Sequence, residues 1–140
     1  MYTKKYIYGI VNMVKKMDCL FCKINSGEIP SKTIYEDEIV RVIMDINPTS
    51  NGHILIIPKK HITDFEAMDN NTLSHINNIA KEMKKVLYQT LNPSGLVLVV
   101  NYGIAQQIKH YHLHLIPAYE IKQELEDIDV IYNKIMQNKN

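Results

Sequence analysis

The sequence predicts an α+β domain: a sheet of about five short, mainly antiparallel strands with one long central helix and a C-terminal helix. Two observations lead to this prediction. Several short β-branched and apolar runs are bounded by turn residues, and one long segment has apolar residues at three- and four-residue spacing instead. At 140 residues, the chain is long enough for a single domain with its own core.

The strands are predicted in order along the chain. Each is a short run rich in β-branched or apolar residues that ends near a polar, Gly or Pro position. Only the polar pair DE separates the first run, TIYE, from the second, IVRVIMD, which favours a hairpin. The predicted strands are 33–36, 39–45, 53–58, 96–101 and 110–119.

The helices are predicted from spacing. Residues 69–95 form the long one; asparagines offer its N-cap, the sequence NPSG ends it, and its apolar stripe comprises Leu73, Ile76, Ala80, Met83, Leu87 and Leu91. Residues 121–140 form a helical tail whose apolar face contains Leu125, Ile128, Ile131 and Ile135. A short turn or helical piece is expected in DCLFCKINSGEIPSK, residues 18–32.

Residues 17–120 are expected to form the main domain. Residues 1–16 are an extension of doubtful origin, because Met17 is a possible natural start. The extension has early lysines, but its apolar run YIYGIV is too short for a signal peptide and lacks a cleavage site. No stretch of the chain approaches the ~18 apolar residues of a membrane span.

The charge balance and the cysteine content limit the binding partners and the cellular compartment that we expect. Sixteen basic residues against fifteen acidic ones give no electrostatic case for binding nucleic acid or an acidic membrane. Cys19 and Cys22 have no other cysteines to pair with, which excludes a disulfide framework and fits a reducing compartment. We therefore expect a cytoplasmic protein.

The stretch KHYHLHLIPAY places three of the six histidines, His110, His112 and His114, at every second position. In a strand these share one face, while Tyr111 and Leu113 share the other. One interpretation is a metal bound by the histidines, but the outer two Cα atoms of a flat strand lie ~13 Å apart, so three rings need a bend to reach one ion. The other is phosphoryl transfer, in which one imidazole attacks phosphorus and its neighbours orient it or stabilise charge.

The sequence HYHLHLI resembles the signature of the histidine triad (HIT) family of nucleotide hydrolases and transferases. The segments CLFCKINSGEIPSKTIYEDE, MDINPTSNGHILIIPKKH and LVLVVNYG also resemble, in order, segments of the nucleotide-binding, phosphoramidase-like branch of that family. Together they cover roughly residues 17–120. The resemblance implies a HIT-like fold and a homodimer paired through the long helix and an edge strand.

The resemblance also implies catalytic roles. His112 would be the nucleophile that attacks the α-phosphorus of a nucleotide, with its other ring nitrogen donating to a backbone carbonyl. His114 would contact the phosphate, and a histidine in this third position favours hydrolysis over transfer. His53, in the sequence NGH, would support the triad from an adjoining strand, although it could be an ordinary strand-start residue.

Further residues are implied to bind the nucleotide. Asp45 would accept hydrogen bonds from the ribose hydroxyls, although an aspartate before Asn47 could equally cap a turn. By the same resemblance, Asn101 and Gln106 would lie on the phosphate side. The base would lie between apolar side chains that on sequence alone fit a core equally well: Leu20, Phe21, Ile24 and Ile46.

Cys19 and Cys22 supply half of a tetrahedral zinc site, and histidines would have to complete it. The resemblance implies that these are His61 and His110, in a closed structural site. A redox dithiol is a weaker alternative, because the pair lies outside a βαβ context. Two free thiols are the other alternative.

The loop before the triad departs from the family pattern. It reads NYGIAQQIKH, two residues shorter than usual, with Ala105 in place of a glycine and Gln107 in place of a Ser or Thr. A Cβ at residue 105 restricts the approach of the backbone to a phosphate. Gln107 cannot act as the hydroxyl that helps to protonate a leaving group in relatives.

The sequence therefore predicts a hydrolase that cleaves at the α-phosphate of purine nucleoside phosphoramidates or dinucleoside polyphosphates through a nucleotidyl-histidine, with structural zinc and no catalytic cofactor. A second hypothesis, favoured by the altered loop, is a nucleotide sensor or adaptor on the same fold. A third is a metalloenzyme whose metal is bound by the triad.

Overall fold

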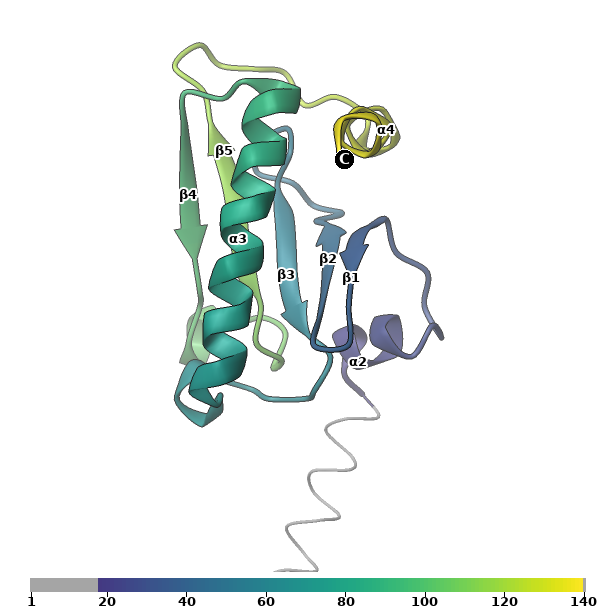
Figure 1. Ribbon diagram of the computed structural model, residues 1–140, viewed down its shortest axis with the longest axis vertical. Coiled ribbons are helices and arrows are strands. Elements are labelled where there is room, and N and C mark those ends of the chain that lie inside the picture. Colours follow the sequence, from purple (N-terminus) through teal and green to yellow (C-terminus); the bar gives the residue numbers. More distant parts are fainter. Residues whose placement is uncertain (1–17, 140) are drawn as a thin grey trace, which may run out of the picture.

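The computed structural model describes residues 18–139, and the predicted extension at 1–16 lies outside them. Within the described residues, the chain forms one five-stranded sheet, in which all paired strands are antiparallel and the order is β1-β2-β3-β5-β4 (Figure 1). The predicted α+β class is confirmed. The strands are β1 (Thr33–Glu36), β2 (Val40–Met44), β3 (Ile54–Pro58), β4 (Gly95–Val99) and β5 (Leu113–Ala118).

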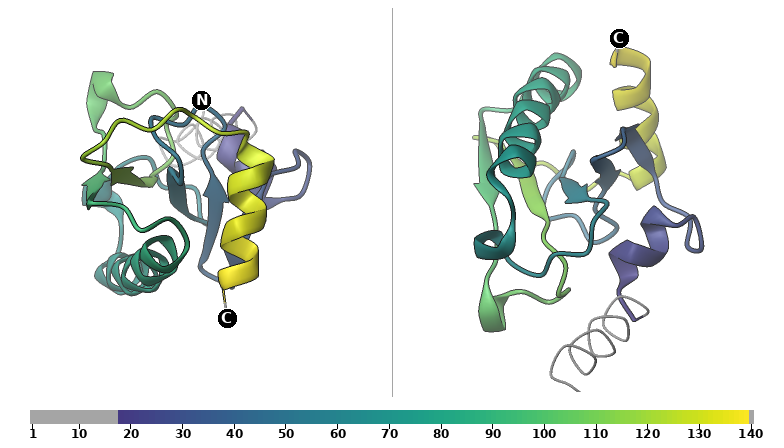
Figure 2. Two further views of the ribbon diagram at one scale, coloured as in Figure 1. Left: turned by 90° about the horizontal axis from the view of Figure 1, so that it is seen from above. Right: turned by 60° about the horizontal axis from the view of Figure 1, so that its bottom comes forward.

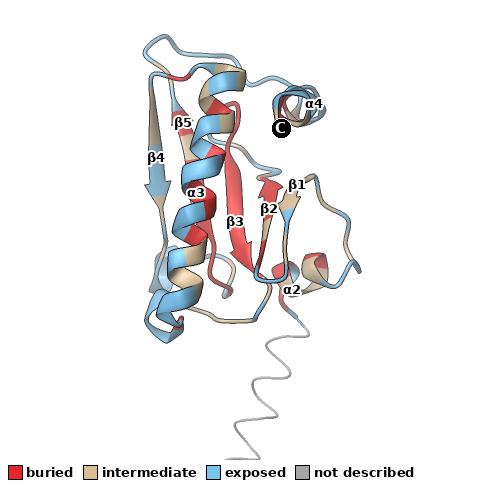
Figure 3. Ribbon diagram, in the orientation of Figure 1, coloured by how far each residue is buried: buried red, intermediate tan, exposed pale blue. Residues whose placement is uncertain are grey.

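Both faces of the sheet are covered. Helices α3 (Asn70–Leu91) and α4 (Ile128–Asn138) lie on one face, and the short helix α2 (Leu20–Asn25) lies on the other (Figure 2). The central strand β3 shows this in its alternation: Ile54 and Ile56 pack towards α3, whereas Leu55 and Ile57 pack towards α2. Every residue of β3 is buried (Figure 3). The site described below lies on the α2 side of this strand.

Helix α3 has the predicted apolar stripe, with Ile76, Ala80, Met83 and Leu87 buried against the sheet and an exposed opposite face (Figure 3). The predicted asparagine N-cap is wrong. Asp69 caps the helix, because its carboxylate accepts the Thr72 backbone N–H at 3.0 Å, whereas the asparagines that follow already lie within the helix. Asn92, in the left-handed conformation with φ 47°, ends it.

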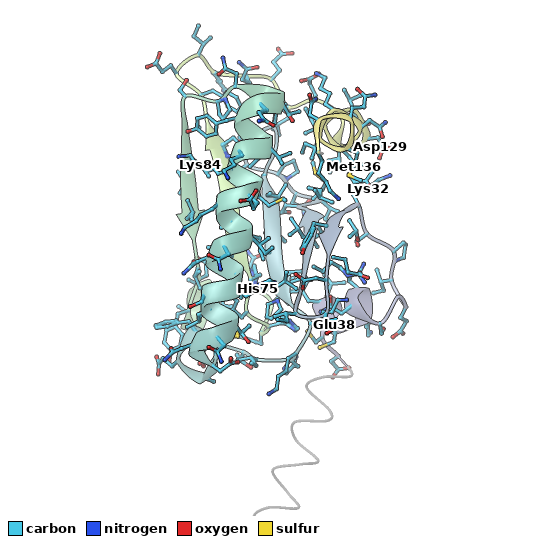
Figure 4. The ribbon with its side chains drawn as sticks, in the orientation of Figure 1. Lys32, Glu38, His75, Lys84, Asp129 and Met136 are labelled. Carbon is cyan, nitrogen blue, oxygen red and sulfur yellow. The ribbon has the colours of Figure 1, made fainter. Side chains whose placement is uncertain are left out.

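The C-terminal helix is shorter than the predicted 121–140, since it begins only at Ile128. Leu125, which was predicted to lie on its apolar face, precedes the helix and is 56% exposed. The cause is Asn51, whose side-chain amide binds backbone groups of residues 124 and 126 at 2.8 and 2.9 Å and holds them out of a helix. Helix α4 then begins after Asp127. An ion pair of 2.7 Å between Lys32 and Asp129 helps to fix α4 beside β1 (Figure 4).

A polar contact joins the N-terminal part of α3 to the turn between β1 and β2. His75 (Figure 4) lies 2.7 Å from a carboxylate oxygen of Asp37. Burial opposes ionisation of this carboxyl, but hydrogen bonds from the Val40 backbone, His75, the Ile39 backbone and Tyr35 hold its pKa well below the ordinary value. Neither His75 nor Asp37 lines the cavity described below. None of the helices within residues 18–139 is long and apolar enough to cross a membrane.

Gly52 leads the chain into β3 and is expected to be intolerant of a side chain. Its φ is +92°, and an added Cβ would lie 2.5 Å from Leu91 Cδ1 and 3.2 Å from Pro117 Cγ. We expect Gly52→Ala to lower the free energy of unfolding in urea by about 3 kcal/mol, from backbone strain plus overpacking.

Gly27→Ala is the matched control for this prediction. Gly27 has a similar φ of +84°, but an added Cβ there would meet no atom within 4 Å. Strain alone should then cost about 1 kcal/mol. Equal losses in the two variants would contradict the packing that the structure shows around Gly52.

Candidate active site

A cavity of about 400 Å³ lies on the α2 side of the sheet. Its apolar part is formed by α2 and by the α2-facing side chains of β2 and β3, such as Ile43 and Leu55. Its polar part is formed by imidazoles and the loop before β5. The structure brings together in its lining nine residues for which the sequence predicted a catalytic or nucleotide-binding role: Leu20, Phe21, Ile24, Asp45, Ile46, His53, Asn101, His112 and His114.

The three alternating histidines share one face, as predicted. Strand β5 begins only at residue 113, not at 110, but the alternation continues ahead of it: Tyr111 and Leu113 are buried in the core that contains α3. The rings of His112 and His114 lie on the opposite face with their centroids 4.8 Å apart. His114 pairs in register with Leu55 of β3, which places it over the α2-side layer.

A backbone contact determines the tautomer of His112. Its Nδ1 lies 2.7 Å from the carbonyl oxygen of His110. A carbonyl can only accept a hydrogen bond, so the proton is on Nδ1 and the lone pair is on Nε2. Burial lowers the pKa of His112, against opposing effects of the His110 hydrogen bond and the Asp45 charge. The ring is therefore neutral at pH 7 with an available lone pair.

The tautomers of His53 and His114 follow from a second chain of contacts. The backbone N–H of Thr49 donates to Nδ1 of His53 at 3.0 Å, so the proton of that ring is on Nε2. This Nε2 lies 2.9 Å from Nδ1 of His114 and donates to it. His114 must then carry its proton on Nε2, a buried atom with no partner among the described residues.

Asp45 lies beside this histidine pair. One of its oxygens accepts a hydrogen bond from the Asn47 backbone N–H at 2.8 Å. This is the turn-capping contact that was the alternative prediction for Asp45. The other oxygen lies 3.3 Å from His53 Nε2 and 3.9 Å from His114 Nδ1. Burial, and repulsion from His112 and His53, still lower the pKa of His114 to about 4 despite the opposing Asp45 charge.

A separate cluster could hold a metal ion: Cys19, Cys22, His61 and His110, as predicted. Nδ1 of His110 lies 3.3 and 3.5 Å from the two sulfurs, and Nδ1 of His61 lies 3.2 Å from the Cys22 sulfur. Tetrahedral zinc with ordinary bond lengths requires sulfur–nitrogen separations of about 3.6 Å. The donor set and its spacing therefore fit zinc.

The partner of the other ring nitrogen of His110 supports this fit. Nε2 of His110 donates to the carbonyl oxygen of Pro58 at 2.8 Å, which leaves the Nδ1 lone pair directed at the sulfurs. Asp45, His53 and His114 are also close enough for one ion. The Thr49 contact, however, places a proton on the His53 nitrogen that would have to coordinate it.

In the loop before β5, the side chains of Lys109 and Gln106 form hydrogen bonds to backbone carbonyl groups. The ammonium of Lys109 donates to the carbonyl oxygens of Gly103 and Gln106 at 2.6 and 2.8 Å. Gln106 is 4% exposed, and its side-chain amide donates to the carbonyl oxygen of Thr63 at 2.6 Å, outside the cavity lining. Gln107 lines the cavity instead. The position of Gln106 therefore gives no support to the phosphate contact that the resemblance implies.

The residues predicted to hold the base are partly core residues. Phe21 is 3% exposed, and its ring packs edge-on against His112 with centroids 4.9 Å apart. Ile24 is also buried, whereas Ile46 is 71% exposed at the rim. Lys32 and Thr49 also line the cavity, although no role was predicted for them. No periodic pattern marks them, because both lie in loops.

The fold and the cavity define a small α+β protein with a histidine-lined pocket and a Cys₂His₂ cluster. The chain matches the model of the HIT domain over residues 26–121 and belongs to the HIT domain family. It is 43% identical over 104 residues to an uncharacterised HIT-like protein of Methanocaldococcus jannaschii, covering 73% of this chain and 80% of that protein.

Two further relatives bear on the chemistry. The chain is 40% identical over 111 residues to the adenosine 5′-monophosphoramidase of Candida albicans, covering 75% of this chain and 73% of that one. The crystal structure of a zinc-bound histidine triad family protein from Mycobacterium smegmatis matches with a TM-score of 0.80 at 29% identity, over 88% of this chain and 94% of that one.

Proposed function

We propose that the protein is a nucleotide hydrolase that cleaves at the α-phosphate of purine nucleoside phosphoramidates or dinucleoside polyphosphates. The contact that carries the proposal is the 2.7 Å hydrogen bond from His112 Nδ1 to the His110 carbonyl, because it leaves the Nε2 lone pair free in a cavity of about 400 Å³. The name of the Candida albicans relative, a monophosphoramidase, supports the same chemistry.

The reaction proceeds in two steps. The Nε2 lone pair of His112 attacks the α-phosphorus and a P–N bond forms, while the bond from phosphorus to the leaving group breaks and that group takes the electron pair and, where it is an amine, a proton from solvent. Water then cleaves the P–N bond, which releases the nucleoside monophosphate and restores the imidazole. The unpartnered Nε2–H of His114 donates to a phosphoryl oxygen in both steps.

In this proposal the Cys₂His₂ cluster binds structural zinc. Its four ligands fill a tetrahedral site, so no coordination position remains for substrate, and His110 connects the N-terminal segment to the triad. No catalytic cofactor is required, because His112 supplies the nucleophile. Two thiols held in such a site suit a reducing compartment, and we place the protein in the cytoplasm.

The substrate test compares adenosine phosphoramidate with diadenosine tetraphosphate. Release of AMP from either supports the hydrolase, and the faster substrate identifies the leaving group. The altered loop favours a second candidate function, nucleotide sensing, because Gln107 in the cavity lining offers no hydroxyl. AMP binding in calorimetry without turnover of either substrate would support the sensor.

We also propose a homodimer. The stripe of α3 is occupied by the core of its own chain, so we propose pairing through the edge strand β4, where Val97 is 45% and Leu98 is 53% exposed. We expect a dimer in light scattering and a monomer for Leu98→Lys, since a lysine on an edge opposes strand pairing.

Ile121→Lys is the control, because Ile121 is 80% exposed on a different segment. This variant should remain dimeric. A monomeric wild-type protein, or a dimeric Leu98→Lys variant, would contradict pairing through β4.

A further inference from the structure

The charged side chain that lies beside the imidazoles of the cavity is a carboxylate, that of Asp45. Among the described residues that line it, only Lys32 and Asp45 carry full charges. The ammonium of Lys32 is paired with Asp129 of α4 at 2.7 Å. Lys109 lies outside the lining, and its ammonium donates to two carbonyls of the loop. The one lysine of the lining is therefore paired with a carboxylate outside it, and the Asp45 carboxylate, next to the imidazoles, is paired with no lysine or arginine.

The imidazoles do not supply a positive charge either. The N–H of Thr49 fixes the tautomer of His53, and His53 in turn fixes that of His114, so each ring uses its one proton as a neutral donor. The nearest ring to His114 is His112, 4.8 Å away between centroids, which has its own proton on the carbonyl of His110. The His114 Nε2–H is buried without an acceptor, which is costly until a ligand provides one.

We propose that this cavity selects α-phosphoryl groups with one negative charge, as in amidates, anhydrides and diesters, over doubly charged phosphate monoesters, and that Asp45 sets the selection. This inference rests on the proposed function, which places the phosphate at His114 Nε2. One oxygen of Asp45 lies 3.9 Å from the opposite nitrogen of the same ring. A second charge on the phosphate would therefore be repelled across one imidazole in a partly buried site.

This charge selection has a consequence for release of the product. The α-phosphate of the proposed substrates has a single charge, and hydrolysis converts it to a monoester with a second ionisation near pH 6. The product thus acquires its second negative charge beside Asp45 once the P–N bond to His112 is cleaved. Repulsion at that point favours release of the nucleoside monophosphate over its retention.

The test compares the dissociation constants of AMP and adenosine 5′-methylphosphate, at about pH 5 and about pH 8, by calorimetry. The methyl ester has one charge at both pH values, so it reports any change in the protein itself. We expect AMP to bind about tenfold more weakly than the methyl ester at pH 8, and about equally at pH 5. In Asp45→Asn the difference at pH 8 should fall to about twofold or less.

The outcomes separate this inference from the proposed function. Equal binding of AMP and the methyl ester at pH 8, or an undiminished difference in Asp45→Asn, would overturn the charge selection while leaving a nucleotide site intact. Binding of neither compound at either pH would overturn the proposed function and this inference with it.

Discussion

Replacement of His112 by Ala is expected to abolish AMP release from adenosine phosphoramidate, with a fall in kcat of roughly 10⁴-fold or more. The physical reason is specific to this ring: its Nδ1 proton is held by the His110 carbonyl at 2.7 Å, and no other nitrogen in the triad combines a free lone pair with a place in the cavity. Nucleotide binding should persist, because the apolar wall from α2 is unchanged.

His75→Ala is the matched control for this variant. His75 belongs to the contact with Asp37 at the β1–β2 turn and does not line the cavity. Its loss should reduce stability and leave kcat near the wild-type value. Wild-type turnover in His112→Ala would remove the histidine nucleophile from the mechanism, whatever the substrate.

Removal of metal is expected to have the largest effect on stability. We expect about one zinc ion per chain in the purified protein, and loss of that ion in the double variant Cys19→Ser, Cys22→Ser. Binding to the folded state alone, at a free zinc concentration a thousand times Kd, contributes about 4 kcal/mol. A strong chelator should therefore lower Tm by about 10 °C or more, and zinc should restore it.

His112→Ala is the control for metal content, because His112 is not part of the Cys₂His₂ cluster. It should retain its zinc. Loss of zinc in this variant would show that the ligands are assigned incorrectly and would favour a metal bound by the triad itself. Full zinc content in the double cysteine variant would contradict the cluster as the metal site.

The strand pattern made the fold predictable, because alternation of apolar residues fixes which face of each strand is buried. It also placed His112 and His114 on one face, opposite Tyr111 and Leu113. The errors occurred where a side chain binds backbone: Asp69 caps α3 in place of an asparagine, and Asn51 holds residues 124–126 out of α4. Periodicity does not detect such contacts.

The tautomers were less accessible from sequence. Those of His110, His112 and His53 are set by three backbone groups: the carbonyls of Pro58 and His110, and the N–H of Thr49. The family resemblance implied a backbone carbonyl as the partner of His112, but backbone groups carry no residue-type signal, so only a structure can show which group meets each ring. For the same reason sequence could not distinguish Gln106, whose amide binds Thr63, from its neighbour Gln107 in the lining.

Covalent attachment of the nucleotide to His112 distinguishes this mechanism from direct attack by water. It is detected when the reaction is stopped within milliseconds and the chain is examined by mass spectrometry. With adenosine phosphoramidate or diadenosine tetraphosphate, we expect an adenylyl group on the peptide that contains His112. It should be acid-labile, as a phosphorus–nitrogen bond is, and absent from His112→Ala. AMP release with no adduct on the wild-type chain, or with an adduct on another residue, would contradict the proposed mechanism.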